Sequence, residues 1–328
     1  MPNDLIICAR RVKGATFVAE PGPSLFVSAP GDAVAHTPAM GRARSNVDPW
    51  MKELMKQAIW GKDSRTGAPR GDILVFVHGY NNDRAIVLRR QRRLRSDLAA
   101  AGYKGAVISF DWPSENMALN YVEDRHDAKM TAMQLVTDCI SLLAERQTPD
   151  CCINVHLLGH STGCLVIREA FDDADDTELR TASWLVSQIA FIGGDISAAS
   201  MSEGSDSTQS LYRHCIRLTN YSNRMDSVLK LSNAKRVGIS PRVGRIGLPG
   251  DAPDKAVDVD CSDYYRMLST VNEVKQADQN EAIGSFDHSW HIGNRVFAAD
   301  LFETLRGDFD RTQIPTRALR DGKLILTR

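Results

Sequence analysis

Ser161 is the residue whose surroundings point most directly to chemistry. It stands in the run Gly159-His160-Ser161-Thr162-Gly163, between an apolar segment and one with helical spacing. A serine on a sharp strand-to-helix turn is raised above a sheet, close to a helix N-terminus, where peptide dipoles favour developing negative charge. Glycines on either side leave room for the neighbouring strand and helix. The pattern predicts a nucleophile, although the five residues alone also fit an ordinary tight turn.

A serine hydroxyl needs a base to become nucleophilic, and three histidines follow Ser161 in the chain. His214 opens an apolar strand, which is typical of a structural residue. His288 lies in a loop just before the last predicted helix, and His291 falls about one turn into that helix, where it could cap the helix or line a pocket. We predict that His288 is the general base, with His291 as the alternative.

An acid would hold the imidazole in one tautomer and stabilise the imidazolium. Asp226 follows the predicted strand 214–220, and Asp195 follows the predicted strand 187–194. Asp260 is a third and weaker candidate. Because all three are at strand ends, where aspartates also commonly cap loops, spacing alone does not choose between them.

Two backbone N–H groups are expected to face the oxyanion of a tetrahedral intermediate. Thr162, the residue after the nucleophile, supplies one. Tyr80 supplies the second, since it follows the first buried strand and the preceding Gly79 lets the backbone approach closely. The remaining motif and pocket candidates are His78, Gly159, His160, Gly163 and Trp290.

Apolar runs and amphipathic segments alternate along most of the chain. This alternation predicts a mainly parallel central sheet flanked by helices on both faces, with active sites beyond the carboxyl ends of the strands. Segment 20–47 is predicted to be a long loop. No large cap domain is expected between the strands at 187–194 and 214–220. The other strands are expected at 4–12, 15–19, 73–79, 106–110, 152–158 and 256–261, and helices at 48–60, 84–102, over about 25 residues ending near Ala144, at 163–172 and at 291–306.

Composition bounds the possible partners. The 328 residues carry a net charge of −1, which gives no general attraction to nucleic acid or an anionic membrane. The six arginines of 84–95 share a helix with inward apolar residues, so we expect them on a solvated face.

Seven irregularly spaced cysteines favour reduced thiols, and neither a zinc spacing nor a nucleotide fingerprint is present. We therefore expect no metal and no cofactor. No membrane span and no signal peptide are predicted, and we expect a cytoplasmic protein.

Several spaced motifs jointly resemble an α/β-hydrolase, and in particular the bacterial group called the "esterase/lipase superfamily". The resemblance covers about residues 70–306 and implies that the acid is Asp226 rather than Asp195. Many relatives have Met where this chain has Thr162. The motifs are VFVHGYNN (75–82), SFDWPS (109–114), LLGHSTG (157–163), YSNRMDSVLKLS (221–232) with PRVG (241–244), and DHSW (287–290).

These expectations combine into one prediction of fold and function. The chain is predicted to be a single α/β-hydrolase domain with N-terminal strands, loop and short helix in 1–70, a catalytic core in 71–306 and a tail in 307–328. It would cleave a small-molecule carboxylic ester by a Ser-His-Asp acyl-enzyme mechanism. An amidase, thioesterase or lactonase with the same residues is the alternative, as is a non-catalytic binding module, since a fold does not guarantee a function. The sequence does not indicate an oligomeric state.

Overall fold

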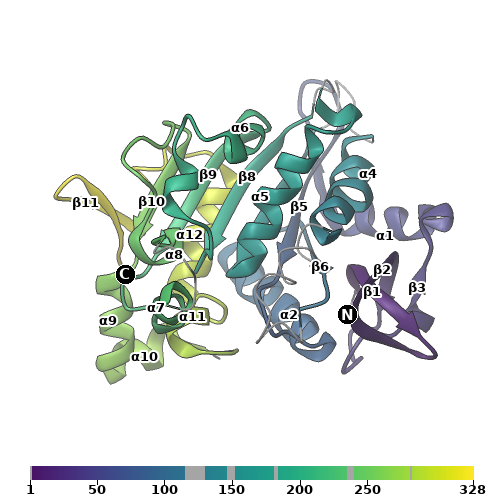
Figure 1. The fold of residues 1–328 in the computed structure, drawn as a ribbon, viewed down its shortest axis with the longest axis horizontal. Coiled ribbons are helices and arrows are strands. Elements are labelled where there is room, and N and C mark those ends of the chain that lie inside the picture. Colours follow the sequence, from purple (N-terminus) through teal and green to yellow (C-terminus); the bar gives the residue numbers. More distant parts are fainter. Residues whose placement is uncertain (1, 115–129, 146–151, 181–183, 235–239, 281–282) are drawn as a thin grey trace.

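The computed structural model describes residues 2–114, 130–145, 152–180, 184–234, 240–280 and 283–328. Its centre is a twelve-stranded sheet with the order β11-β12-β10-β9-β8-β7-β5-β6-β1-β2-β3, and β4 pairs with β5 outside this path. The purple N-terminal strands lie at one end of the molecule and β11 at the opposite end (Figure 1). The strands are β1 (Asp4–Lys13), β2 (Thr16–Ala29), β3 (Gly41–Arg42), β4 (Ile59–Lys62), β5 (Pro69–Val77), β6 (Ala106–Asp111), β7 (Cys152–His160), β8 (Val186–Ile192), β9 (Cys215–Ser222), β10 (Ala256–Asp260), β11 (Arg317–Arg320) and β12 (Lys323–Leu326).

The pairing within the sheet is mostly parallel, as predicted. Strands β1, β6, β5, β7, β8, β9, β10 and β12 pair in parallel in that spatial order, and the antiparallel pairs are those of β2, β3, β4 and β11. Parallel strands bring their carboxyl ends to one edge of a sheet. The loops that follow β5, β6, β7, β8 and β9 therefore start from the same edge.

Helices cover both faces of this sheet, as predicted. On β5, Leu74 and Phe76 belong to one apolar cluster, whereas Val75 and Val77 belong to another, because successive strand side chains point to opposite faces. Helices α2, α9 and α12 contribute to the cluster of Leu74, and α1 and α5 to that of Val75. The helices are α1 (Asp48–Ala58), α2 (Arg84–Ala101), α4 (Ser141–Ala144), α5 (Thr162–Ala174), α6 (Asp206–Arg213), α7 (Ser227–Ala234), α8 (Val243–Ile246), α9 (Ser262–Thr270), α10 (Asn272–Asp278), α11 (Phe286–Ser289) and α12 (Arg295–Arg306).

The segment predicted as a loop over 20–47 is partly strand, so that prediction is wrong in its first third. Strand β2 continues through Pro21 and Pro23 to Ala29. A proline lacks an amide hydrogen and is tolerated at an unpaired edge. Strand β3 pairs with β2 only near Phe26 and Val27, which leaves the proline-bearing part of β2 with β1 as its one described partner.

Two other predictions about the C-terminal part of the chain are wrong, and one prediction is tested only in part. Strand β10 is not the last strand, because β11 and β12 in the tail extend the sheet beyond it. The last helix begins at Arg295 and not at His291, since the Asn294 side chain accepts a hydrogen bond from the Phe297 amide and caps it. The helix of about 25 residues predicted to end near Ala144 falls partly on 115–129, outside the described residues. Its described part contains a π-helical stretch from Leu135 to Ile140 and ends at Ala144, as predicted.

Replacing Gly163 tests how closely α5 packs against β5. A Cβ at Gly163 would lie 2.2 Å from the Val77 carbonyl oxygen and 2.6 Å from that of His78. We expect Gly163→Ala to lower the free energy of unfolding by about 1–3 kcal/mol in urea denaturation, because the helix must move away from the strand. Gly250→Ala is the control, since no atom lies within 4 Å of its Cβ position. Equal stability of the two variants would contradict the tight approach.

Candidate active site

Ser161 occupies the turn between β7 and α5 with φ 55° and ψ −123°. A non-glycine residue with positive φ is uncommon and costs on the order of 1–3 kcal/mol, so the surrounding structure must hold it in place. The Ser161 amide donates to the Ile192 carbonyl at 3.0 Å, and its carbonyl accepts from the amides of Cys164 and Asp195 at 3.1 Å each. These bonds fix the serine between the ends of β7 and β8.

Three glycines make room for this turn. A Cβ at Gly79 would lie 2.7 Å from the Ser161 Cβ, and one at Gly159 would lie 2.9 Å from the Cα of Cys164. Gly163 lies against the end of β5, as described above. The loop after β5 therefore approaches Ser161 as closely as backbone atoms allow.

His288 and Asp226 form a buried pair next to this turn. The Nδ1 atom of His288 lies 2.7 Å from Oδ2 of Asp226, and the two residues are 6% and 1% exposed. The other carboxylate oxygen accepts from the Leu229 amide at 2.9 Å, in the first turn of α7. With Nδ1–H donating to the carboxylate, the neutral ring presents the lone pair of Nε2, for which no partner occurs among the described residues.

The ring of His288 packs beside the backbone that holds Ser161. A Cβ on Gly193 would lie 3.0 Å from Cε1 of His288, and Gly193 directly follows Ile192, which accepts the Ser161 hydrogen bond. The structure thus brings Ser161, His288 and Asp226 to the carboxyl ends of β7, β8 and β9.

The alternative acids contact other groups. Oδ1 of Asp195 lies 3.2 Å from Nε of Arg242. Asp260 accepts hydrogen bonds from the amide and hydroxyl of Ser262, and its Oδ2 lies 3.4 Å from Arg224. Of these three aspartates, Asp226 is the one that forms a hydrogen bond with His288 in the described part of the chain.

The alternative histidines lie in the core. The ring of His214 stacks on Trp184 with 4.2 Å between ring centroids. The ring of His291 stacks on Trp290 at 4.0 Å, and neither of its nitrogens has a hydrogen-bond partner in the described part of the chain. Trp290 itself is fully buried against Tyr264, so its ring is part of the core.

The loop after β5 carries the predicted second oxyanion donor. The Asn82 side chain donates to the carbonyls of Gly79 at 2.7 Å and Tyr80 at 2.8 Å, and the Asn81 amide donates to Ser114 at 2.8 Å. Thr162, the other predicted donor, is the first residue of α5. Both backbone segments border the Ser161 turn.

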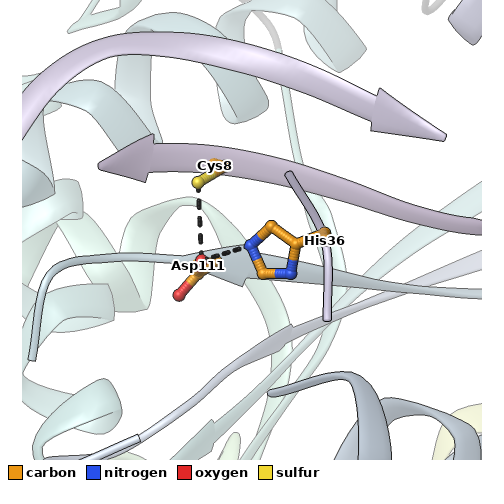
Figure 2. Close-up of side chains that lie close together, drawn as sticks. All are labelled: Cys8, His36 and Asp111. Atoms are coloured by element: carbon orange, nitrogen blue, oxygen red, sulfur yellow. Dashed lines mark hydrogen bonds and ion pairs between the residues drawn. The ribbon is translucent and has the colours of Figure 1, made fainter. Parts of the chain in front are cut away.

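His78 belongs to a buried cluster beneath this loop. Its Nε2 lies 2.9 Å from Oδ1 of Asp111, and burial lowers its pKa despite that carboxylate. Figure 2 shows the Asp111 carboxylate in contact with both Cys8 and His36. Its Oδ2 lies 3.4 Å from Sγ of Cys8 and 2.7 Å from Nε2 of His36. Cys8, His36 and Asp111 are close enough to hold a metal ion, but Nε of Arg10 lies 2.9 Å from both carboxylate oxygens. The positive charge that faces Asp111 is therefore the guanidinium.

Arg90 is a site residue that the sequence prediction missed. It is 6% exposed, and its guanidinium lies 3.3 Å from Nδ1 of His160 and 3.3 Å from the hydroxyl of Ser289. Burial lowers the pKa of Arg90 to about 10 and, together with this arginine, holds the pKa of His160 well below its usual range. The neutral His160 ring lies 3.4 Å from the His288 carbonyl through Nε2, so it supports the backbone of the base.

The prediction of a solvated arginine face on α2 is therefore wrong for Arg90, and four of the other five arginines are only partly exposed. Arg92 and Arg95 also pair with the buried Asp4, at 2.6 Å each. A signal for Arg90 was present in the sequence, because it falls on the helical stripe of Val87, Leu94 and Leu98.

A family model described as "Alpha/beta hydrolase of unknown function (DUF900)" matches residues 57–280. The chain belongs to this family of alpha/beta hydrolases. The matched range includes Ser161, Asp226 and Tyr80, whereas His288 and the strand β1 lie outside it. A search of curated proteins gives no match.

Solved structures of hydrolases are similar to the chain at low identity. A dienelactone hydrolase from Anabaena variabilis ATCC 29413 has 16% identity and a TM-score of 0.34, over 65% of this chain and 84% of its own. An esterase/lipase from an uncultured bacterium has 13% identity and a TM-score of 0.34, over 80% and 90%. A cutinase-like protein from Cryptococcus sp. has 13% identity and a TM-score of 0.30, over 74% and 93%. In the described residues, no helix is both long and apolar enough to cross a membrane.

His291→Phe tests the buried, neutral state of His291. Burial holds the pKa of His291 well below its usual range, while an imidazole in the unfolded chain has a pKa of about 6.5. As the pH falls below that value the unfolded chain binds a proton that the native state does not, so stability decreases. We expect the unfolding free energy of His291→Phe to depend less on pH than that of the wild type. Below pH 6.5 the two slopes should differ by up to about 1.4 kcal/mol per pH unit.

Urea denaturation between pH 5 and 8 measures this slope. Above pH 7.5 the wild type and the variant should have the same slope, which serves as the internal control. Equal slopes below pH 6.5 would show that His291 is protonated in the native protein as readily as in the unfolded one.

Proposed function

We propose that this alpha/beta hydrolase cleaves carboxylic esters through an acyl-enzyme on Ser161. The observation that carries the proposal is the buried hydrogen bond of 2.7 Å between Asp226 and Nδ1 of His288. It leaves Nε2 of the ring as a base, and the ring packs beside the backbone that holds the strained serine turn. This arrangement matches the roles of base and orienting acid in serine hydrolases.

The proposed reaction has two halves. Nε2 of His288 takes the proton of the Ser161 hydroxyl as Oγ attacks the ester carbonyl, and the imidazolium then gives that proton to the leaving alcohol. The charge on the carbonyl oxygen is met by the N–H groups of Thr162 and Tyr80. Water next attacks the acyl-enzyme while His288 again accepts a proton, which returns to Ser161 as the acid is released.

An ester is preferred over an amide as substrate because an alcohol leaving group demands less of the general acid. A thioesterase, amidase or lactonase would use the same residues. A small-molecule substrate, rather than nucleic acid or a membrane, and a cytoplasmic location remain predictions from composition. The competing function is a binding module without catalysis.

A fluorophosphonate probe distinguishes an enzyme from a binding module. We expect the folded wild type to be labelled at Ser161 and to hydrolyse at least one ester in a screen of short- and long-chain acyl esters. Ser161→Ala should lose the label and about 10⁴-fold or more in kcat, because the nucleophile is absent. Intact-mass spectrometry and ester turnover are the measurements. Folded wild type that takes up no probe would exclude the enzyme.

Asp226→Asn and Asp195→Asn separate the proposed acid from its alternative. Asp226→Asn should lower kcat by about 10⁴-fold, since an amide does not hold His288 in the required tautomer. Asp195→Asn should keep kcat and instead lower the thermal midpoint, because Arg242 loses a buried anionic partner. Steady-state kinetics and thermal unfolding of both variants decide the matter. Loss of turnover in Asp195→Asn alone would reverse the assignment.

A further inference from the structure

The N-terminal strand β1 reaches the loop that carries the predicted oxyanion donor. Strand β1 pairs in parallel with β6, so that Cys8 lies opposite Asp111 at the carboxyl end of β6. Ile6 and Cys8 share one apolar cluster, while Leu5 and Ile7 belong to another, so the two faces of β1 alternate. Arg10 continues the face of Cys8 and thereby points toward Asp111.

Arg10 and Asp111 form an ion pair without access to solvent. Nε of Arg10 lies 2.9 Å from each oxygen of Asp111, and the side chains are 1% and 0% exposed. His36 and His78 also lie within hydrogen-bond distance of the same carboxylate. A buried charge that loses its partner is strongly unfavourable, so each ion holds the other in one place.

The guanidinium also holds the loop 78–82, which we call the oxyanion loop. Nη2 of Arg10 donates to the Asn82 carbonyl at 2.7 Å. The Asn82 side chain in turn donates to the carbonyls of Gly79 and Tyr80. A continuous series of hydrogen bonds therefore leads from β1 to the peptide groups around the N–H of Tyr80.

Neighbouring contacts hold both ends of the same loop. The indole of Trp112 donates to the His78 carbonyl at 2.7 Å, and Nε2 of His78 lies 2.9 Å from Asp111. The hydroxyl of Ser114 lies 3.3 Å from the Asn82 amide. The ion pair of Arg10 and Asp111 thus contacts both ends of the oxyanion loop.

The pairing of β1 with β2 is irregular at Arg10. The register shifts between Cys8 and Arg10 and again between Arg10 and Val12. Such irregularities bend a strand and redirect a side chain, and they occur often next to active sites. The local geometry of β1 is consistent with a strand shaped to deliver one guanidinium.

We propose that Arg10 is a positioning residue that holds the oxyanion loop in its working conformation through Asn82. This inference rests on the proposed function and assigns a role to the N-terminal segment, which precedes the family-matched range 57–280. Arg10 acts through the loop and touches no reacting atom. Its loss should therefore weaken binding of the tetrahedral state more than binding of the ester.

The experiment compares three variants of the full chain. Arg10→Met removes the guanidinium. Asn82→Ala keeps the ion pair and removes the two hydrogen bonds to Gly79 and Tyr80. Arg317→Met is the matched control, because Arg317 and Asp300 form another ion pair with both side chains 0% exposed. All three are assayed well below their thermal midpoints, with an ester found in the substrate screen and with a trifluoromethyl ketone of the same acyl group.

We expect Arg10→Met and Asn82→Ala to lose about 10- to 100-fold in kcat with KM within about twofold, since small displacements of a catalytic group have effects of this size. Affinity for the trifluoromethyl ketone, which forms a tetrahedral adduct, should fall by the same factor as kcat/KM. The midpoint of the pH profile should stay in place, because His288 is unaltered. Arg317→Met should lose stability and keep kcat.

Three results would overturn the inference while leaving the proposed function intact. The first is unchanged kcat in folded Arg10→Met. The second is unchanged kcat in Asn82→Ala, which can be measured even if Arg10→Met does not fold. The third is stoichiometric zinc in the purified wild type by elemental analysis, lost in Cys8→Ala, which would make the cluster a metal site. A wild type that takes up no fluorophosphonate would instead overturn the proposed function, and this inference with it.

Discussion

The strained backbone of Ser161, with its positive φ, is the constraint on which the rest of the site depends. At φ 55° the chain turns sharply from β7 into α5, and the cost of that turn, on the order of 1–3 kcal/mol, requires support from both sides. The support is the hydrogen bonding to Ile192 and Asp195 and the close approach of Gly79 and Gly163. Glycine is required at these positions because any Cβ would push the neighbouring loop or helix away from the serine.

Electrostatics impose a second constraint, because the groups around this turn are buried. Arg10 faces a carboxylate, whereas the described partners of Arg90 are neutral: an imidazole, a hydroxyl and a backbone carbonyl. A positive His160 would lie between Arg90 and His288, so its lowered pKa preserves the site from like-charge repulsion. The buried cation next to His160 also favours negative charge near the serine turn, which is where an oxyanion would develop.

The central parallel strands of the sheet were predicted well from the sequence, whereas the outer strands at its two edges were predicted poorly. The difference has a physical reason. Buried strands such as β5 and β7 are continuous apolar runs, and Ser161 follows one of them directly, so local pattern was sufficient. Strand β2 contains Pro21, Gly22 and Pro23, which indicate a loop until a partner strand on one side is known. The tail strands β11 and β12 likewise depend on pairing with each other and with β10.

Within the candidate site, the sequence located the three residues that the structure brings together, and it could not separate the acids by spacing. Asp195 and Asp226 both follow parallel strands, and what distinguishes them is a partner: Arg242 for one and His288 for the other. Arg90 was missed because it is one of six arginines in 84–95, which together suggest a solvated face, while its helical position among Val87, Leu94 and Leu98 indicates burial. A long charged side chain can be solvated or buried, and its tertiary contacts determine which of the two occurs.

The order of strands in the sheet, more than the order along the chain, determines what reaches the serine turn. Strand β1 pairs in parallel with β6, which is distant from it in sequence. This pairing brings Arg10 to Asp111, the last residue of β6, and to Asn82, which follows β5. Strand β9 and α7 bring Asp226 from the other side, and His288 enters from the segment before α12. The oxyanion loop is therefore held by Arg10, near the N-terminus, whereas the proposed base, His288, comes from the C-terminal part of the chain and is held by Asp226. It follows that the serine turn needs the central strands β5, β7 and β8, whereas the groups that would activate it come together only when the two outer parts of the sheet have paired with this centre.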